Sequence, residues 1–102
     1  MDHRRKLLRT LASSLFLYEK IQTAYQNGKA VKSYAEKAIT RSKDSSLHSR
    51  RILLSKLSPM AAKKAIEVLG PKFKERKGGY TRITKLAPRV NDGAAVAVIE
   101  LV

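Results

Sequence analysis

Cysteine and tryptophan are both absent from the 102 residues of the chain. Without cysteine, disulfides, thiolate zinc sites and thiol nucleophiles are excluded. The two histidines, His3 and His48, are too few to form a metal site on their own. Long hydrophobic runs are also missing, since no apolar stretch approaches the ~20 residues of a membrane-spanning helix. We therefore expect neither a metal cofactor nor a membrane span.

Acidic residues are scarce as well: 8 Asp and Glu stand against 22 Lys and Arg, a formal net charge of +14. Such an excess makes the compact state repel itself unless a polyanion neutralises it. Nucleic acid is the commonest such partner, because each neutralised phosphate also releases a counterion; an anionic membrane surface is the competing one. With 43% hydrophobic residues, the chain can still bury one modest core, so we expect a single domain over residues 1–102.

Catalytic motifs are missing too. The 8 acidic residues are scattered without the pairing of a general acid–base site, and no nucleophile elbow, phosphate loop or dinucleotide fingerprint occurs. These absences predict a protein that is not an enzyme and takes no cofactor or small-molecule substrate.

The hydrophobic pattern predicts helices first and strands last. Apolar residues recur at helical spacing over residues 2–18, 29–42, 47–57 and 59–69. Segments rich in β-formers occupy residues 20–24, 80–86 and 96–102. The last of them is a near-continuous apolar run, which indicates burial on both faces. We therefore expect an α+β fold in which about four helices pack on a small mixed three-stranded sheet.

Local signals mark the ends of these elements. Asn27-Gly28 predicts a turn before the second helix, and Gly70-Pro71 predicts the end of the fourth. Ser45 or Ser46 is suited to cap the third helix, and Ser58 to cap the fourth.

Basic residues gather at the start of the first predicted helix, where they are His3, Arg4, Arg5, Lys6 and Arg9. Positive charge is unfavourable at the positive end of the helix dipole, and unpaired backbone N–H groups attract phosphate there. Arg5, Lys6 and Arg9 also share one side of the helix, opposite its leucines. We interpret the cluster as a phosphate clamp, with a merely solvated terminus as the alternative.

Arg50 and Arg51 are a second candidate, on the third predicted helix among apolar neighbours. Their side chains are long enough to cover the core with their stems or to reach phosphates. The sequence leaves both interpretations open.

A third candidate combines cations with two adjacent glycines. Its proposed RNA-binding residues are Arg76, Lys77, Gly78, Gly79, Tyr80 and Arg82. Glycine allows the backbone to lie against a sugar–phosphate surface, and Tyr80 is able to stack on a base. The pattern fits equally well a glycine turn that feeds a strand whose tyrosine packs inward, and the two interpretations can hold together.

The same segment carries a family resemblance. Residues 76–83, with Lys85, Pro88-Arg89 and residues 97–101 behind them, closely resemble the C-terminal signature of the bacterial-type ribosomal protein L-seventeen family. Earlier segments resemble that family too, among them His3-Arg4, Leu7-Leu8-Arg9, Ile21-Gln22-Thr23, Ala35-Glu36-Lys37 and Arg50-Arg51. The resemblance extends over essentially the whole chain.

The resemblance implies both a function and a place. Members of this family bind large-subunit ribosomal RNA in bacteria, mitochondria and plastids, near the polypeptide exit region and beside other large-subunit proteins. It implies a structural constituent that supports assembly of the large subunit, in a cytoplasmic or organellar ribosome, with Lys85 and Arg89 as further RNA contacts. The chain departs from the family in starting without the usual basic arm, and in having Val90-Asn91-Asp92 where a basic loop is common.

The alternative function is a DNA- or RNA-binding regulatory module outside the ribosome, built on a helix-turn-helix around residues 43–46. Against it, cations are spread over nearly every predicted element and no recognition helix stands out. Binding to a membrane surface would require a wide, unburied apolar face on the first helix. The sequence favours the ribosomal interpretation.

Overall fold

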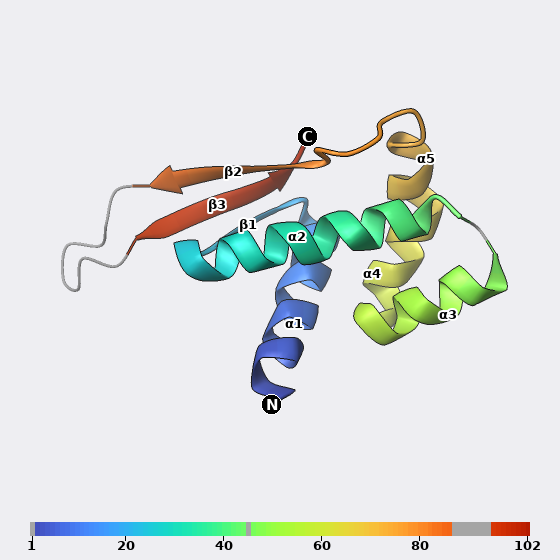
Figure 1. Cartoon of the computed structure of the whole chain (residues 1–102), viewed down its shortest axis with the longest axis horizontal. Helices are drawn as coiled ribbons and strands as arrows, with labels where there is room; N and C mark the ends of the chain where they lie inside the picture. The colour runs from blue at the N-terminus through green and yellow to red at the C-terminus, as the bar shows by residue number, and fades with distance from the viewer. Residues whose placement is uncertain (1, 45, 87–94) are drawn as a thin grey trace.

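The structure is α+β, with helices packed on a three-stranded sheet as the sequence predicts (Figure 1). It is a computed structural model that describes residues 2–44, 46–86 and 95–102. The helical elements are α1 (Asp2–Tyr18), α2 (Tyr25–Ser42), α3 (Leu47–Lys56), α4 (Pro59–Lys64), the π-helical turn η1 (Ala65–Leu69) and α5 (Gly70–Lys72). The strands are β1 (Lys20–Ala24), β2 (Thr81–Leu86) and β3 (Val96–Leu101). The predicted loop over residues 88–93, with Arg89, lies outside the described residues.

The sheet has the order β1-β3-β2, and both of its pairings are antiparallel. The prediction of a mixed sheet is therefore wrong in this respect. The connection from β2 to β3 is shorter than the dozen or more residues that a parallel crossover needs, so these strands pair as neighbours in opposite directions. In the central register, Ile99 of β3 lies between Ile21 and Ile83.

Helix α2 covers one face of this sheet along its length (Figure 1). It begins at Tyr25, so the predicted turn at Asn27-Gly28 is wrong. A Cβ on Gly28 would lie only 3.0 Å from Cδ1 of Ile83 and 3.4 Å from Cδ1 of Ile99. Glycine is used here for the close approach of helix and sheet, and this contact outweighs its low helix propensity.

The outer face of the sheet is open. Alternate residues on this face include Val98 and Glu100, which are half-buried, and Arg82 and Thr84, which are exposed. The expectation that the last strand is buried on both faces is therefore wrong. On the face towards α2, Ala97 and Ile99 are fully buried, whereas on the opposite face burial is confined to Val96 at the start of the strand.

The core lies between α1, α2, the α3–α5 region and the inner face of the sheet. Its largest fully buried side chains include Leu15, Phe16, Ile39, Leu53, Leu57, Leu69, Tyr80 and Ile99. Two serine caps fix the turns that bring α3 and α4 onto it. The Ser49 N–H donates to Ser46 Oγ at 3.2 Å, and the Ala61 N–H donates to Ser58 Oγ at 3.3 Å. Both caps confirm the sequence prediction.

Gly70 does not end the helical segment, contrary to the prediction. The chain passes through η1 into α5 and leaves the helix only at Phe73. A Cβ on Gly70 would lie 2.6 Å from the backbone oxygen of Ser42, closer than any side chain tolerates. Gly70 therefore serves the close contact between α5 and the end of α2, which no local signal in the sequence reveals.

Candidate nucleic-acid interface

Three hollows adjoin one another along α2, two of them beside α3 and the third beside the loop before β2. The N-terminal hollow, of about 430 Å³, is lined by Arg5, Lys6, Arg9, Tyr34, Ser55 and Lys56. The central hollow, of about 230 Å³, is lined by Tyr34, Lys37, Ala38, Arg41, Ile52, Leu53 and Lys56. The glycine-loop hollow, of about 580 Å³, is lined by Glu36, Lys37, Thr40, Arg41, Asp44, Lys77, Gly78 and Tyr80.

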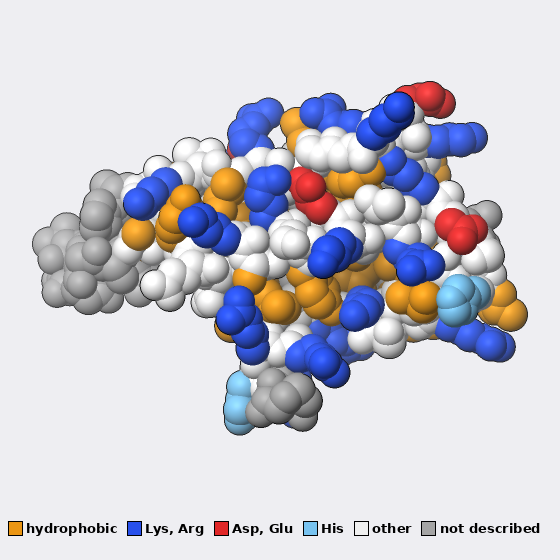
Figure 2. Space-filling view, viewed as in Figure 1, with side chains coloured by type: hydrophobic (Ala, Val, Ile, Leu, Met, Phe, Trp, Pro, Cys, Tyr) orange, Lys and Arg blue, Asp and Glu red, His pale blue; other side chains and the backbone are white. Residues whose placement is uncertain are grey.

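These hollows are continuous because neighbours share lining residues. Tyr34 and Lys56 line both the N-terminal and the central hollow, and Lys37 and Arg41 line both the central and the glycine-loop hollow. We call the three together the basic groove. Figure 2 shows Lys and Arg side chains spread over this side of the molecule, with hydrophobic side chains exposed between them. Such a groove suits a polyanion that lies along it.

The cations of the groove are not neutralised by ion pairs within the described part of the chain. The ion pairs found there are Lys32–Glu36 at 3.1 Å, Lys64–Glu19 at 2.9 Å and Arg82–Glu100 at 3.7 Å. None of them uses a cation that lines the groove. The groove therefore keeps a positive potential that an external anion can offset.

The N-terminal hollow brings together cations that lie far apart in the sequence. Arg5, Lys6 and Arg9 come from α1 and Lys56 from the last turn of α3. Arg9 Nη2 donates to the Leu57 carbonyl at 2.9 Å, which places a cation at the negative end of α3 and fixes α1 against it. Three of the five residues predicted to form a phosphate clamp thus lie together in one hollow, and the sequence did not predict Lys56 beside them.

Tyr34 completes this hollow from α2. Its hydroxyl donates to the Lys56 carbonyl at 2.6 Å, another contact at the end of α3. Burial raises the pKa of the Tyr34 hydroxyl, although the nearby Arg9 and Arg5 guanidinium groups act in the opposite direction. The phenol is therefore neutral at pH 7, and it adds aromatic surface to the groove without adding negative charge.

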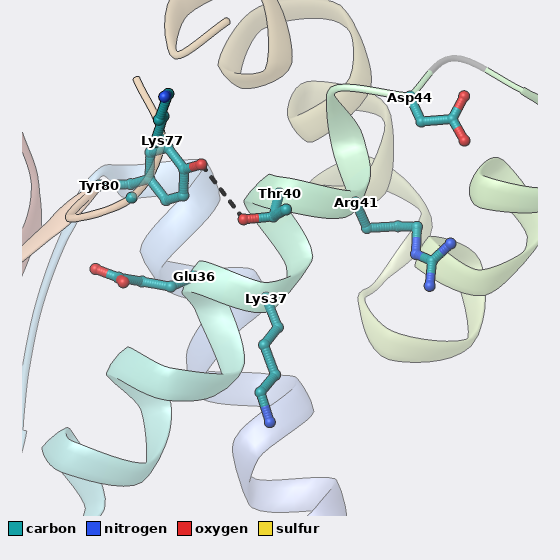
Figure 3. A pocket seen from close by; sticks show the side chains of 8 residues that line it. Glu36, Lys37, Thr40, Arg41, Asp44, Lys77 and Tyr80 are labelled. Carbon is teal, nitrogen blue, oxygen red and sulfur yellow. Dashed lines mark hydrogen bonds between the residues drawn. The ribbon is translucent and has the colours of Figure 1, made fainter. Parts of the chain in front are cut away.

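The glycine-loop hollow has a different character, which Figure 3 shows. Lys37 and Arg41 extend to the side of α2 away from Tyr80, and Lys77 points away from the helix. Thr40 Oγ1 donates to the Tyr80 hydroxyl at 3.3 Å, and that hydroxyl donates to the Arg76 carbonyl at 3.1 Å. The centre of this hollow is thus occupied by a network that holds the loop to α2.

Tyr80 packs inward, as the second interpretation of this segment predicts. Its side chain is 1% exposed. The ring packs on Phe73 with centroids 5.2 Å apart, and the Lys43 ammonium lies 4.6 Å from the ring centroid. Burial raises the pKa of Tyr80, but hydrogen bonds involving Lys43 and Thr40 outweigh it and lower the pKa below its ordinary value. Tyr80 therefore anchors the loop and has no free face for RNA.

Two carboxylates also line the glycine-loop hollow. Glu36 accepts hydrogen bonds from the Thr81 N–H at 3.2 Å and the Thr81 hydroxyl at 2.9 Å. Burial raises the pKa of Glu36, but its bonds with Lys32 and Thr81 outweigh this and lower the pKa overall. Hydrogen bonds from Ser49 and Ser46 lower the pKa of Asp44. Both groups are therefore negative at pH 7, which makes this hollow less favourable for phosphate than the N-terminal one.

The glycine pair has one conformational requirement. Gly79 has φ of 64°, in the left-handed region that favours glycine. A Cβ at Gly78 or at Gly79 would meet nothing within 4 Å. The loop therefore needs glycine at 79 for its backbone, and the open space beside both residues leaves room for a close ligand.

The remaining predicted site residues do not line the groove. His3 and Arg4 are exposed on α1. Arg50 and Arg51 are both exposed on α3, and Arg50 lines a separate hollow of about 270 Å³. The other members of the predicted set are the exposed cations of the loop and β2, namely Arg76, Arg82 and Lys85. Of these, Arg82 faces Glu100 on the outer side of the sheet, and Lys85 lies 4.8 Å from the Tyr25 ring.

The described residues contain neither a membrane-spanning helix nor a cluster of metal ligands. No helix in the described ranges is both long and apolar enough to cross a bilayer. Nor do the described residues bring three histidine or acidic side chains together where a metal ion could bind.

Comparison with known proteins gives the family. The family model described as Ribosomal protein L17 matches residues 7–102. A protein named large ribosomal subunit protein bL17 from Endomicrobium trichonymphae is 46% identical over 102 residues, covering 99% of this chain and 87% of that relative. Proteins of the same name from Caldanaerobacter subterraneus subsp. tengcongensis and Clostridium acetobutylicum are 48% and 44% identical, each covering 99% of this chain and 91% and 90% of the relative. The sequence resemblance is thereby confirmed, and the chain belongs to the ribosomal protein L17 family.

Proposed function

We propose that this protein is a structural constituent of the large ribosomal subunit that binds large-subunit ribosomal RNA through the basic groove and supports subunit assembly. Relatives that are 44–48% identical carry the name large ribosomal subunit protein. The observation that carries the proposal is the N-terminal hollow, in which four cations converge and no carboxylate lines the surface. Such a site favours a phosphate group over any neutral or cationic ligand.

Binding along the groove follows from counterion release. Seven cations line the three hollows: Arg5, Lys6, Arg9, Lys37, Arg41, Lys56 and Lys77. If each neutralises one phosphate, the log of the binding constant should fall with the log of the salt concentration with a slope of about −5 to −6. The contact is electrostatic, so it positions the RNA backbone without reading its sequence.

A subunit-incorporation experiment tests this function. The groove triple variant combines Arg5→Ala, Lys6→Ala and Lys56→Ala, and it keeps Arg9 because that side chain also holds α3. The control triple variant combines Lys20→Ala, Lys63→Ala and Lys74→Ala, which removes the same charge from exposed residues outside the groove. Tagged proteins are fractionated on sucrose gradients at low and moderate salt.

We expect the wild type and the control triple variant to sediment with large subunits, and the groove triple variant to be lost from them as salt rises. Sedimentation of the wild type apart from ribosomes, or with DNA, would contradict the ribosomal function. Equal retention of both triple variants would contradict the role of the groove.

A further inference from the structure

The central hollow is lined differently from its two neighbours. Its apolar part is formed by Ala38, Ile52 and Leu53, and its cations are Lys37, Arg41 and Lys56. A phosphate gains nothing from an aliphatic surface, because it would lose hydration there without a compensating bond. A nucleobase has an apolar face and a polar edge, so it matches both parts of this lining.

The size of the central hollow also suits a nucleobase. Its volume of about 230 Å³ is about half that of the N-terminal hollow and less than half that of the glycine-loop hollow. Pockets for drug-sized ligands usually measure about 300–1,000 Å³. The central hollow therefore fits one ring system, while the wider hollows on both sides leave space for the chain that carries it.

The polar groups of the lining select among bases. The side chains of Lys37, Arg41 and Lys56 supply only hydrogen-bond donors, and no carboxylate lines this hollow. The Tyr34 hydroxyl donates its proton to the Lys56 carbonyl, so its oxygen remains only as an acceptor. Guanine presents two adjacent acceptors, O6 and N7, on one edge, where adenine and cytosine present an amino group and uracil a single carbonyl. Three cationic donors beside one tyrosine acceptor therefore match guanine best.

We propose that the central hollow receives one unstacked nucleobase, with guanine the best match, from the RNA strand whose phosphates occupy the N-terminal hollow. This inference rests on the proposed function and adds a base-specific contact to the backbone contacts. Proteins read RNA mostly where single-stranded bases are free to turn outward and to lie on aromatic or arginine side chains. Tyr34 and Arg41 offer such surfaces within the lining.

Ultraviolet cross-linking of the wild-type protein bound to large-subunit ribosomal RNA tests the contact without any substitution. We expect a nucleotide attached to Tyr34, or to its immediate neighbours on α2, and identified by mass spectrometry as guanosine. RNA that binds but cross-links only to residues outside the central hollow would overturn the proposal.

A matched pair of substitutions provides the second test. Ala38 and Ala62 are 5% and 1% exposed, and each lines a separate hollow, of about 230 and 270 Å³. Ala38→Leu fills the central hollow, whereas Ala62→Leu fills the hollow beside Arg50. We expect Ala38→Leu to weaken RNA binding roughly 10-fold, the size of one lost base contact, with an unchanged salt slope, and Ala62→Leu to bind as the wild type does.

The outcomes separate this proposal from the proposed function. Failure of the wild type to bind RNA at all would overturn both. RNA binding that Ala38→Leu leaves unchanged would overturn the base contact alone. Loss of incorporation into subunits, with unchanged affinity for free RNA, would instead assign the hollow to a side chain of a neighbouring protein and would also overturn it. If Ala38→Leu fails to fold, the cross-linking result decides.

Discussion

The two outer hollows of the basic groove both contain cations, yet they differ in what surrounds those cations. In the N-terminal hollow, Arg5, Lys6, Arg9 and Lys56 converge without a carboxylate. In the glycine-loop hollow, Glu36 and Asp44 stand among the lining residues, and hydrogen bonds lower the pKa of both. The number of basic residues in a segment therefore does not show how strongly its surface attracts phosphate. What distinguishes the two hollows is the position of the few acidic side chains.

The two hollows also differ in how firmly they are built. The glycine-loop hollow contains the buried Tyr80 and its hydrogen bonds to Thr40 and Arg76, which tie the loop to α2. The N-terminal hollow is held by two contacts to the end of α3, from Arg9 and Tyr34, and its Arg5 and Lys6 are exposed. The first arrangement serves the fold as much as the ligand. The second leaves Arg5 and Lys6 exposed to an external anion.

The largest expected effect is a loss of RNA affinity when the cations of the N-terminal hollow are removed. The groove triple variant should bind large-subunit ribosomal RNA roughly 150- to 2,000-fold more weakly, because each of the three lost hydrogen bonds to phosphate is worth about 1–1.5 kcal/mol. The control triple variant should lose far less. Filter binding at one salt concentration measures both, with thermal unfolding as the check that each variant is folded. Similar losses in the two variants would remove the distinction between the N-terminal hollow and the rest of the surface.

The next effect concerns the backbone of the glycine loop. Gly79→Val should destabilise the protein by about 1–3 kcal/mol, because a β-branched residue resists the left-handed φ at this position. Gly78→Val is the control, since a Cβ there also meets open space and its φ is not in that region. Urea unfolding measures both. Equal stability of the two variants would show that Gly79 is not needed for its conformation.

A smaller effect is expected from Lys77, the cation that the loop before β2 contributes to the glycine-loop hollow. Lys77→Ala should weaken RNA binding only a few-fold and make the salt slope shallower by less than one unit, because Glu36 and Asp44 already reduce the local potential. Lys56→Ala, in the hollow without carboxylates, should change the slope by about one unit. A larger change for Lys77→Ala than for Lys56→Ala would reverse the comparison.

The smallest expected effect is that Glu36 makes the stability of the folded protein depend on pH. Because the pKa of Glu36 is lowered in the folded protein, its carboxylate contributes stability above the unfolded pKa of about 4.3. That contribution is lost as the pH falls through the lower, folded pKa. The Glu36→Gln variant should therefore be less stable than the wild type at pH 7, by up to about 1 kcal/mol for the partly exposed Lys32–Glu36 ion pair. This difference in stability should shrink towards pH 3.5.

Urea unfolding at several pH values measures this, with Glu67→Gln as an exposed control. A stability difference that stays constant from pH 7 to pH 3.5 would show that the Glu36 charge is not what ties α2 to β2.

The sequence predicted those features that depend on neighbouring residues. Helical spacing placed Arg5, Lys6 and Arg9 on one side of α1, and the chemistry of serine caps placed the starts of α3 and α4. Lys56 was missed because its place beside α1 depends on how α3 packs, which no short segment encodes. A usable signal did exist for Lys37 and Arg41, which are four residues apart on one helix and therefore share a face.

The roles of two glycines also depend on packing between distant elements, which the local sequence does not show. Because glycine usually punctuates the chain, the sequence predicts a turn at Gly28 and the end of a helix at Gly70, whereas the structure uses both for close contacts between distant elements. Tyr80 was left open between an outward and an inward position, since a tyrosine before a strand suits both. Its partners, Phe73 and Thr40, come together only in the folded chain.

The most direct measurement of where the RNA lies uses the absence of cysteine from the chain. Ser55→Cys places a single thiol in the N-terminal hollow, and Thr84→Cys places one on the exposed outer face of the sheet. Each thiol is linked to an iron–EDTA group, and hydroxyl radicals then cleave the nearby backbone of bound ribosomal RNA. Strong, localised cleavage from position 55 and little from position 84 is the result expected if the groove carries the RNA. Equal cleavage from both, or cleavage from position 84 alone, would contradict it.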